Sequence, residues 1–214
     1  DALPPALSQE DNPGMFISSV AESTAEGELA EYYRAQRAAW GFLPNYTAAF
    51  SSRPDVAGAW NTLNATIRDG MDRRRFEIAT IAAARARRST YCTAAHSKFL
   101  RDVCGDETAM RSIGEQTDGA GLDAQDRAVY EFAGAVAADA ASVSAQDVDR
   151  LRAAGLSDAD IADVVFAVSA RCFFTAVLDG LGAQLDPETA ETFDAALLDS
   201  MIVGRPVGEA DRAH

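Results

Sequence analysis

The sequence predicts an all-α protein of about eight or nine helices in one domain. Apolar residues recur at helical spacing along most of the chain. Residues that start or stop helices separate these segments. With 48% apolar residues among 214, the chain is long enough to bury one sizeable core. We expect this domain to span residues 26–200, with an N-terminal arm at 1–25 and a C-terminal tail at 201–214.

The first half of the chain divides at prolines and glycines. Residues 1–24 contain three prolines and no helical period, so we expect an arm that is disordered or laid over a neighbouring subunit. Residues 26–40 form an amphipathic helix by their apolar spacing. Pro44 and Pro54 are each suited to opening a helix, and the second of these helices is expected to stop at Gly70.

The second half continues the pattern after a loop rich in glycine at 114–122, the best candidate for a subdomain boundary. Residues 123–138 and 144–155 are expected to form helices. Ser157 begins a strongly apolar helix as a capping residue, with Asp160 at the capping-box position. A final helix is expected from Asp186 to about Leu198.

The segment between residues 71 and 105 carries the candidate chemistry. Met71 to Arg88 reads as a largely buried helix, and a second helix is expected to begin near Ser89 and to end at Gly105. Cys92 then lies in the first turn of the second helix, where the partial positive charge favours a thiolate. His96 follows four residues later, on the same face of that helix.

Glu77 completes this group if the two helices form an antiparallel hairpin. Glu77 and His96 are then about equally far from the turn, so they face each other across it. A carboxylate beside an imidazole fixes its tautomer and raises its basicity, as in nucleophilic catalysis. The alternative is structural: a buried cysteine is often an inert small hydrophobic residue, and a single histidine on a helix is usually structural.

Composition narrows the classes of partner and ligand. A formal net charge of −14 makes nucleic acid and anionic membrane surfaces poor partners. No apolar run approaches the roughly 20 residues that cross a bilayer, and three scattered cysteines indicate neither a secreted disulfide scaffold nor a zinc site. We expect a cytoplasmic protein without a metal or another cofactor.

A glutamate followed after about a dozen residues by S-x-Y-C-x-x-A-H resembles the signature of the carboxymuconolactone decarboxylase and alkylhydroperoxidase-D-like superfamily. The resemblance is strongest over residues 70–104. The stretches G-F-L-P-N and R-P-x-x-x-x-A-W are similar to its peroxidase-related branch. By position, Glu77, Cys92 and His96 match the family's glutamate, second cysteine and histidine. Ser89 stands where the family has its first cysteine. The resemblance also implies a homo-oligomer, a trimer or a multiple of one.

The first functional hypothesis is a thiol-dependent peroxidase that reduces a small hydroperoxide. Cys92 attacks the peroxide, His96 takes its proton with Glu77 as orienting group, and Tyr91 donates a hydrogen bond to the site. Since Ser89 cannot resolve the sulfenic acid, reduction needs Cys172, a cysteine of another subunit or an external thiol. We favour Cys172 as a packed core residue.

The second hypothesis is a decarboxylase or lactone-handling enzyme, which the other branch of the superfamily implies. Glu77 and His96 are then the acid and base for a small organic acid, and Cys92 is incidental. An arginine such as Arg85 or Arg171 is expected to face the pocket. A third hypothesis is a non-catalytic oligomeric protein, which a buried and unreactive Cys92 would favour. Arg171, on an apolar helix, is expected to need a carboxylate or a position at the rim.

Overall fold

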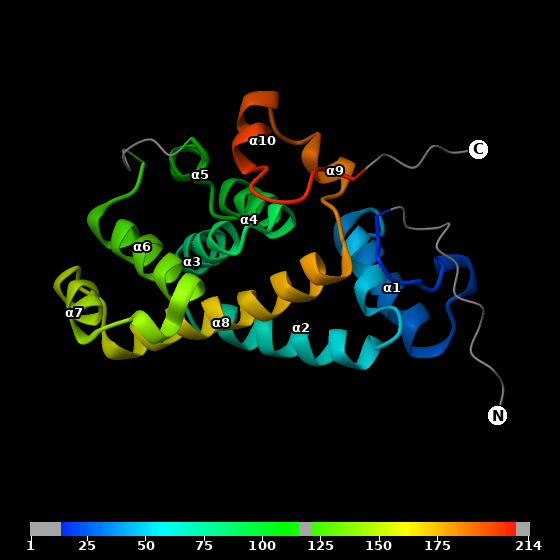
Figure 1. The fold of residues 1–214 in the computed structure, drawn as a ribbon, viewed down its shortest axis with the longest axis horizontal. Coiled ribbons are helices and arrows are strands. Elements are labelled where there is room, and N and C mark those ends of the chain that lie inside the picture. Colours follow the sequence, from blue (N-terminus) through cyan, green and yellow to red (C-terminus); the bar gives the residue numbers. More distant parts are fainter. Residues whose placement is uncertain (1–13, 116–120, 209–214) are drawn as a thin grey trace.

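The computed structural model describes residues 14–115 and 121–208, and within them the chain is helical. Among these residues there are ten α-helices and three short 3-10 helices (Figure 1). The α-helices are α1 Gly27–Trp40, α2 Pro54–Asp69, α3 Arg73–Ala86, α4 Thr90–Asp102, α5 Glu107–Gly114, α6 Ala124–Asp139, α7 Ala145–Ala153, α8 Asp158–Leu181, α9 Pro187–Ala190 and α10 Ala195–Met201. The 3-10 helices are Glu22–Thr24, Asn45–Phe50 and Ala140–Ser142. The all-α fold predicted from the sequence is confirmed.

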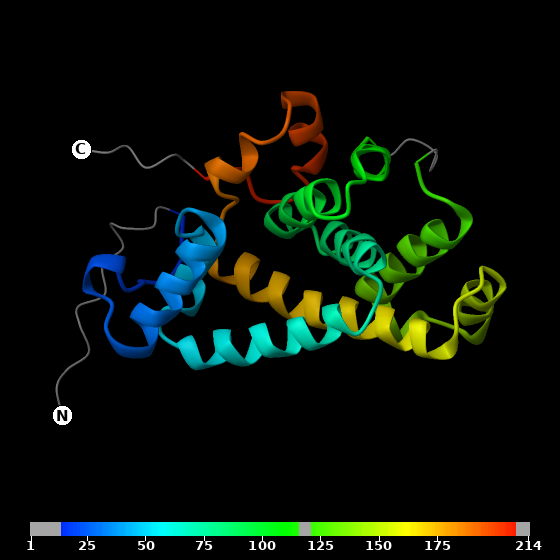
Figure 2. The ribbon, with the colours of Figure 1, turned by 180° about the vertical axis from the view of Figure 1, so that it is seen from behind.

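The hairpin of α3 and α4 lies at the centre of the molecule. Helix α3 packs against α4, α6 and α8, and nine consecutive residues from Phe76 to Ala84 are buried on every side. This explains the run of alanines in α3, because neighbouring helices approach it from several directions. Helices α2 and α8 pack against each other on one side of the hairpin, and α5, α9 and α10 pack against α4 on the other (Figures 1 and 2).

Two apolar clusters fill the interior. The larger one contains residues of every helix from α3 to α10, so chain from both sides of the 114–122 loop shares one core. The smaller one joins the 3-10 helix Asn45–Phe50 and α2 to α8 and holds Cys92. That loop therefore does not separate two cores; its residues 116–120 lie outside the described part of the chain.

Local capping determines most of the helix boundaries. Asp72, Asp106, Asp123, Ser157 and Asp194 each accept a hydrogen bond from a backbone N–H in the first turn of the helix that follows. The capping box of Ser157 and Asp160 is present, as predicted. Gly41 and Gly182 end α1 and α8 with left-handed backbone angles that favour glycine.

One prediction about the helices was wrong, and one helix was not predicted at all. Helix α5 was not foreseen, and the expected final helix from Asp186 to Leu198 is two helices, α9 and α10. The break follows from tertiary contacts: Phe193 is buried beneath the guanidinium of Arg101, which also donates to the carbonyl of Thr192. Asp194 then caps the new helix through the N–H of Leu197.

The flanking segments pack on their own chain where they are described. The N–H of Phe16 donates to the carbonyl of Leu181, and Tyr33 donates to the carbonyl of Val20. From residue 14 onward the arm therefore packs on its own chain and is ordered; residues 1–13 lie outside the description. At the other end, Gly208 pairs with Leu185, and residues 209–214 are likewise not described.

Helix α8 contributes to both apolar clusters of the domain. Its 24 residues are long and apolar enough to cross a membrane by length and composition, but half of its most apolar window is buried inside the protein. A core helix passes the same test. The expectation that no apolar run approaches that length was therefore too strict.

Candidate active site

The turn between α3 and α4 brings the candidate residues together. Arg88 adopts a left-handed backbone conformation (φ 57°), which lets the N–H of Ser89 return to the carbonyl of Ala84 and reverses the chain. Helix α4 begins at Thr90 with Ser89 as its N-cap residue. Cys92 is thus in the first turn, as the sequence predicted, although the Ser89 side chain makes no capping hydrogen bond.

Glu77 and His96 meet across the hairpin, as predicted. Nδ1 of His96 lies 2.6 Å from Oε2 of Glu77, and both side chains are buried. Oε1 of the same carboxylate accepts from Nε of Arg73, one turn earlier on α3, at 2.6 Å. Because an ionised carboxylate only accepts, Nδ1 carries the imidazole proton and Nε2 has a free lone pair.

The environment keeps Glu77 ionised and His96 neutral. Burial acts to raise the pKa of Glu77, but the hydrogen bonds from His96 and Arg73 and the charge of Arg73 hold it below its usual value. Burial, together with the charge of Arg171, lowers the pKa of His96 to about 4 against the pull of Glu77. At neutral pH the pair is therefore a carboxylate that orients a neutral base.

Cys92 is more deeply buried than the sequence argument assumed, with 1% of its surface exposed. Burial raises the pKa of its thiol, and the nearby charge of Arg171 and the Ser89 hydroxyl oppose that rise only in part. The expected low-pKa thiolate at the helix start is therefore wrong for the resting site: desolvation outweighs the helix end.

Arg171 of α8 contacts this thiol. Its Nη1 lies 3.6 Å from Sγ of Cys92, and only 4% of the residue is exposed. The guanidinium also stacks over the rings of Trp60 and Phe174. Within the described chain its Nε has no hydrogen-bond partner, and no carboxylate pairs with it. The expectation that Arg171 needs a carboxylate or a rim position was therefore wrong.

Two predicted contributors take other positions. The hydroxyl of Tyr91 donates to Oδ2 of Asp186 and not to the Glu77–His96 pair. The hydroxyl of Ser89 is fully buried and has no hydrogen bond of normal geometry among the described residues. Asp186 also accepts the backbone N–H of Asn45 at 2.6 Å, and burial raises the pKa of its carboxyl to about 6.

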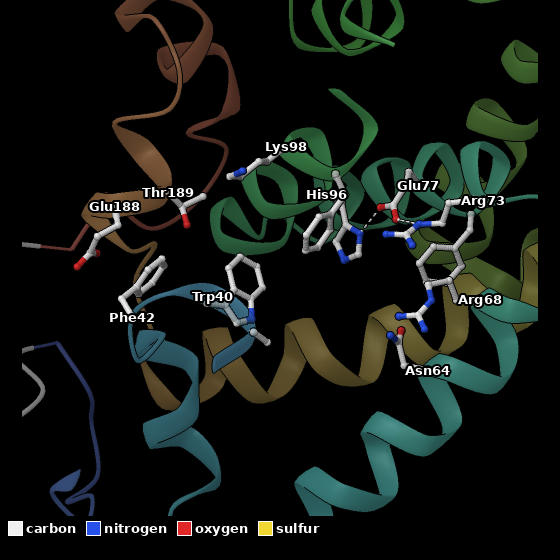
Figure 3. A pocket seen from close by; sticks show the side chains of 13 residues that line it. Trp40, Phe42, Asn64, Arg68, Arg73, Glu77, His96, Lys98, Glu188 and Thr189 are labelled. Atoms are coloured by element: carbon white, nitrogen blue, oxygen red, sulfur yellow. Dashed lines mark hydrogen bonds and ion pairs between the residues drawn. The ribbon is translucent and has the colours of Figure 1, made fainter. Parts of the chain in front are cut away.

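A cavity of about 380 Å³ opens beside the Glu77–His96 pair, the candidate proton relay (Figure 3). Glu77 and His96 line it, whereas Cys92 is not among its lining residues. Part of its wall is aromatic and is formed by Trp40, Phe42, Phe76 and Phe99. Another part is cationic and is formed by Arg68, Arg73 and Lys98. Neither Arg85 nor Arg171 lines this cavity; Arg85 donates to the carbonyl of Ser200.

The other two cysteines differ from Cys92 in their surroundings. All three are free thiols. Cys172 packs against the larger apolar cluster, whereas Cys92 belongs to the smaller one, and burial raises the pKa of Cys104 and Cys172 as well. Among the described residues no group of three His, Cys, Asp or Glu side chains is arranged to hold a metal ion.

The sequence predicted the Glu77–His96 pair but not the residues that contact this pair, nor those that contact Cys92 and Tyr91. Arg73 had a signal, because it precedes Glu77 by four residues on one helix face. The pairing of Arg171 with Cys92 had none, since 79 residues separate them. Asp186 was considered only as a helix start.

The helical hairpin thus carries a buried acid–histidine pair beside a cavity. Residues 54–108 match the carboxymuconolactone decarboxylase family, and the fold matches alkylhydroperoxidase-D-like structures. The chain is therefore similar to this family over the segment that carries Glu77, Cys92 and His96, and its likeness to the solved structures is one of fold. No curated protein matches the chain.

Three solved structures show the same fold. An alkylhydroperoxidase AhpD core, an uncharacterized peroxidase-related protein from Ralstonia eutropha JMP134, is 19% identical, with 83% of this chain and 95% of that chain covered and a TM-score of 0.74. A peroxidase-related protein from Silicibacter sp. TM1040 is 19% identical, with 86% and 97% covered and a TM-score of 0.70. The debrominase Bmp8 is 20% identical, with 86% and 96% covered and a TM-score of 0.67. The names of these similar proteins point to different activities: a decarboxylase family, peroxidase-related proteins and a debrominase.

Proposed function

We propose that the protein is a thiol-dependent oxidoreductase of the peroxidase type, with Cys92 as nucleophile. The observation that supports this most directly is the contact between Arg171 and Cys92. A buried guanidinium is costly without a counter-charge, and the Cys92 thiolate is the anion that stands within reach. Arg171 therefore stabilises the thiolate that forms during the reaction, even though burial keeps the resting thiol protonated.

In the first step the thiol proton goes to Nε2 of His96, directly or through a water. The thiolate attacks the outer oxygen of a hydroperoxide ROOH: an S–O bond forms, the O–O bond breaks, and the alkoxide takes the proton to leave as ROH. The sulfur is oxidised by two electrons to a sulfenic acid. Glu77 holds the imidazole in the tautomer that accepts the proton.

In the second step an external thiol reduces the enzyme. One thiol condenses with the sulfenic acid to give a mixed disulfide and water, and a second thiol releases the Cys92 thiol and a small disulfide. Ser89 cannot take this role because it has no sulfur. A thiol pool of this kind fits the cytoplasmic location that we infer from the cysteine usage.

The experiment is a sulfenylation assay on the reduced protein. One equivalent of an organic hydroperoxide is added with a sulfenic-acid trap, and the modified cysteines are identified by mass spectrometry. We expect rapid trapping at Cys92 that is lost in His96→Ala, whereas Cys104→Ser is a matched control that leaves it unchanged. If Cys92 reacts no faster than Cys104, the proposal is wrong.

A second candidate is acid–base catalysis on a small organic acid, such as decarboxylation of a lactone. The cavity favours it, because Glu77 and His96 line that cavity and Cys92 does not. The variant Cys92→Ser distinguishes the two candidate functions. That variant keeps the full rate of an acid–base enzyme, measured as release of carbon dioxide from a carboxylated lactone, and has no peroxidase activity.

We also propose that the protein is a homo-oligomer that buries one face of α2 and α8. Leu63 of α2 and Phe166 and Phe173 of α8 are about half exposed, at 54%, 55% and 46%. Phe166 and Phe173 are seven residues apart and so lie on one helix face. Large apolar side chains gathered in this way are typical of contact surfaces.

A further inference from the structure

The cavity beside His96 has two chemically different walls. Figure 3 shows Arg68 and Asn64 of α2 turned toward Arg73 of α3 at one end, with Trp40 and Phe42 on the other side of His96. The rings of Trp40 and Phe99 are 5.5 Å apart, and those of Phe99 and His96 5.6 Å. The apolar wall therefore runs up to the imidazole.

The cationic end has unused hydrogen-bond donors. Nε of Arg73 donates to Glu77, and Nε of Arg68 donates to Asp69 at 2.9 Å. Among the described residues the terminal nitrogens of both guanidinium groups have no hydrogen-bond partner. Both side chains are about one third exposed, so these donors are open to a ligand that enters the cavity. Paired N–H groups of this geometry match a carboxylate.

The acidic residues of the cavity do not cancel this charge. Glu77 already accepts from both Arg73 and His96. Glu188 is exposed to solvent and lies away from Arg68 and Arg73, near Phe42 and Thr189 (Figure 3). An anion is therefore favoured at the Arg68 end and disfavoured at the Glu188 end, which gives a bound molecule one orientation.

We propose that this cavity binds a substrate with a flat apolar body and one carboxylate. Arg68 and Arg73 hold the carboxylate, assisted by the amide of Asn64. The body lies along Trp40 and Phe42, past Nε2 of His96. The volume of about 380 Å³ is within the range of small-molecule sites. What happens to the bound molecule rests on the proposed function, but the binding does not.

The test compares a carboxylate with its neutral amide. Hydrocinnamate and hydrocinnamamide are titrated into the wild-type protein and into Arg68→Gln by isothermal calorimetry. We expect the acid to bind more tightly than the amide to the wild type, and Arg68→Gln to weaken the acid alone, by roughly ten- to a hundredfold for the loss of a charge-assisted hydrogen bond. Arg53→Gln is the matched control, because that exposed arginine pairs with Asp55 outside the cavity.

The experiment also separates this proposal from the peroxidase proposal. Cys92→Ser is expected to bind hydrocinnamate as the wild type does, so a failure of thiol chemistry leaves the binding result intact. Equal affinities for the acid and the amide overturn the carboxylate site. An Arg68→Gln variant that is folded by circular dichroism and binds the acid with unchanged affinity overturns it as well.

Discussion

Replacing Arg171 with methionine is expected to raise the pKa of the Cys92 thiol further. Nη1 and Sγ are 3.6 Å apart. Two unit charges at that distance attract by about 5 kcal/mol at an effective dielectric constant of about 20, which corresponds to roughly 3 pKa units. Since structural relaxation and entering water weaken the interaction in practice, we expect a rise of about 2 units.

The assay is the pH dependence of Cys92 alkylation. The rate is followed by mass spectrometry of the modified peptide, with Cys104 and Cys172 as internal references in every sample. Alkylation requires the thiolate, so its midpoint reports the pKa. Methionine keeps most of the apolar stem of Arg171 against Trp60, and thermal unfolding checks that the variant is folded.

Two further variants make the result decisive. Arg171→Lys keeps a positive charge and is expected to shift the midpoint less than methionine does. Arg53→Met removes an exposed arginine paired with Asp55 and is expected to shift nothing. If Arg171→Met moves the midpoint by less than about half a unit, Arg171 does not stabilise the thiolate, and the main support for the peroxidase proposal is gone.

Three other perturbations test separate parts of the structure. Glu77→Gln removes the carboxylate that orients His96, and we expect peroxide-dependent trapping of Cys92 to fall by roughly ten- to a hundredfold or more; an unchanged rate would show that the relay is not used. Asp186 has a pKa raised to about 6, so the folded protein binds more protons than the unfolded one from about pH 4 to 6, and this group's contribution to stability is lost as pH rises through that window. The free energy of unfolding of Asp186→Asn, relative to that of the wild type, should therefore increase by about 3 kcal/mol from the low-pH end to the high-pH end of the window. Urea unfolding at both ends measures this difference, and a constant difference contradicts the burial argument. Phe166→Ser combined with Phe173→Ser should yield a smaller species in analytical ultracentrifugation, and a wild type that is already monomeric would refute the contact surface.

The part of the site built from one hairpin was predictable from the sequence. Ser89 as a helix start, Cys92 in the first turn and His96 one turn later depend on local spacing. The pairing of Glu77 with His96 needed only the assumption that α3 and α4 run antiparallel. The 2.6 Å contact confirms it, because the turn leaves the two residues at equal distances. The catalytic roles of these residues, and of Ser89 and Tyr91, stay predictions.

Other features of the site were decided by contacts between distant parts of the chain. Arg171 reaches Cys92 because α8 packs on α3 and α2, and that burial is also what raises the thiol pKa against the effect of the helix start. The cations of the cavity come from the end of α2, the start of α3 and, for Lys98, from α4, and no local pattern says that they converge.

The sequence by itself determined the helical class, most helix boundaries and the acid–histidine pair, since these follow from periodicity, capping residues and one short turn. Tertiary structure alone decided which groups surround the thiol, where the final helix breaks and which residues line the cavity. The physical reason is that desolvation and charge pairing depend on what packs across space. Spacing along one helix specifies only which of its own residues share a face.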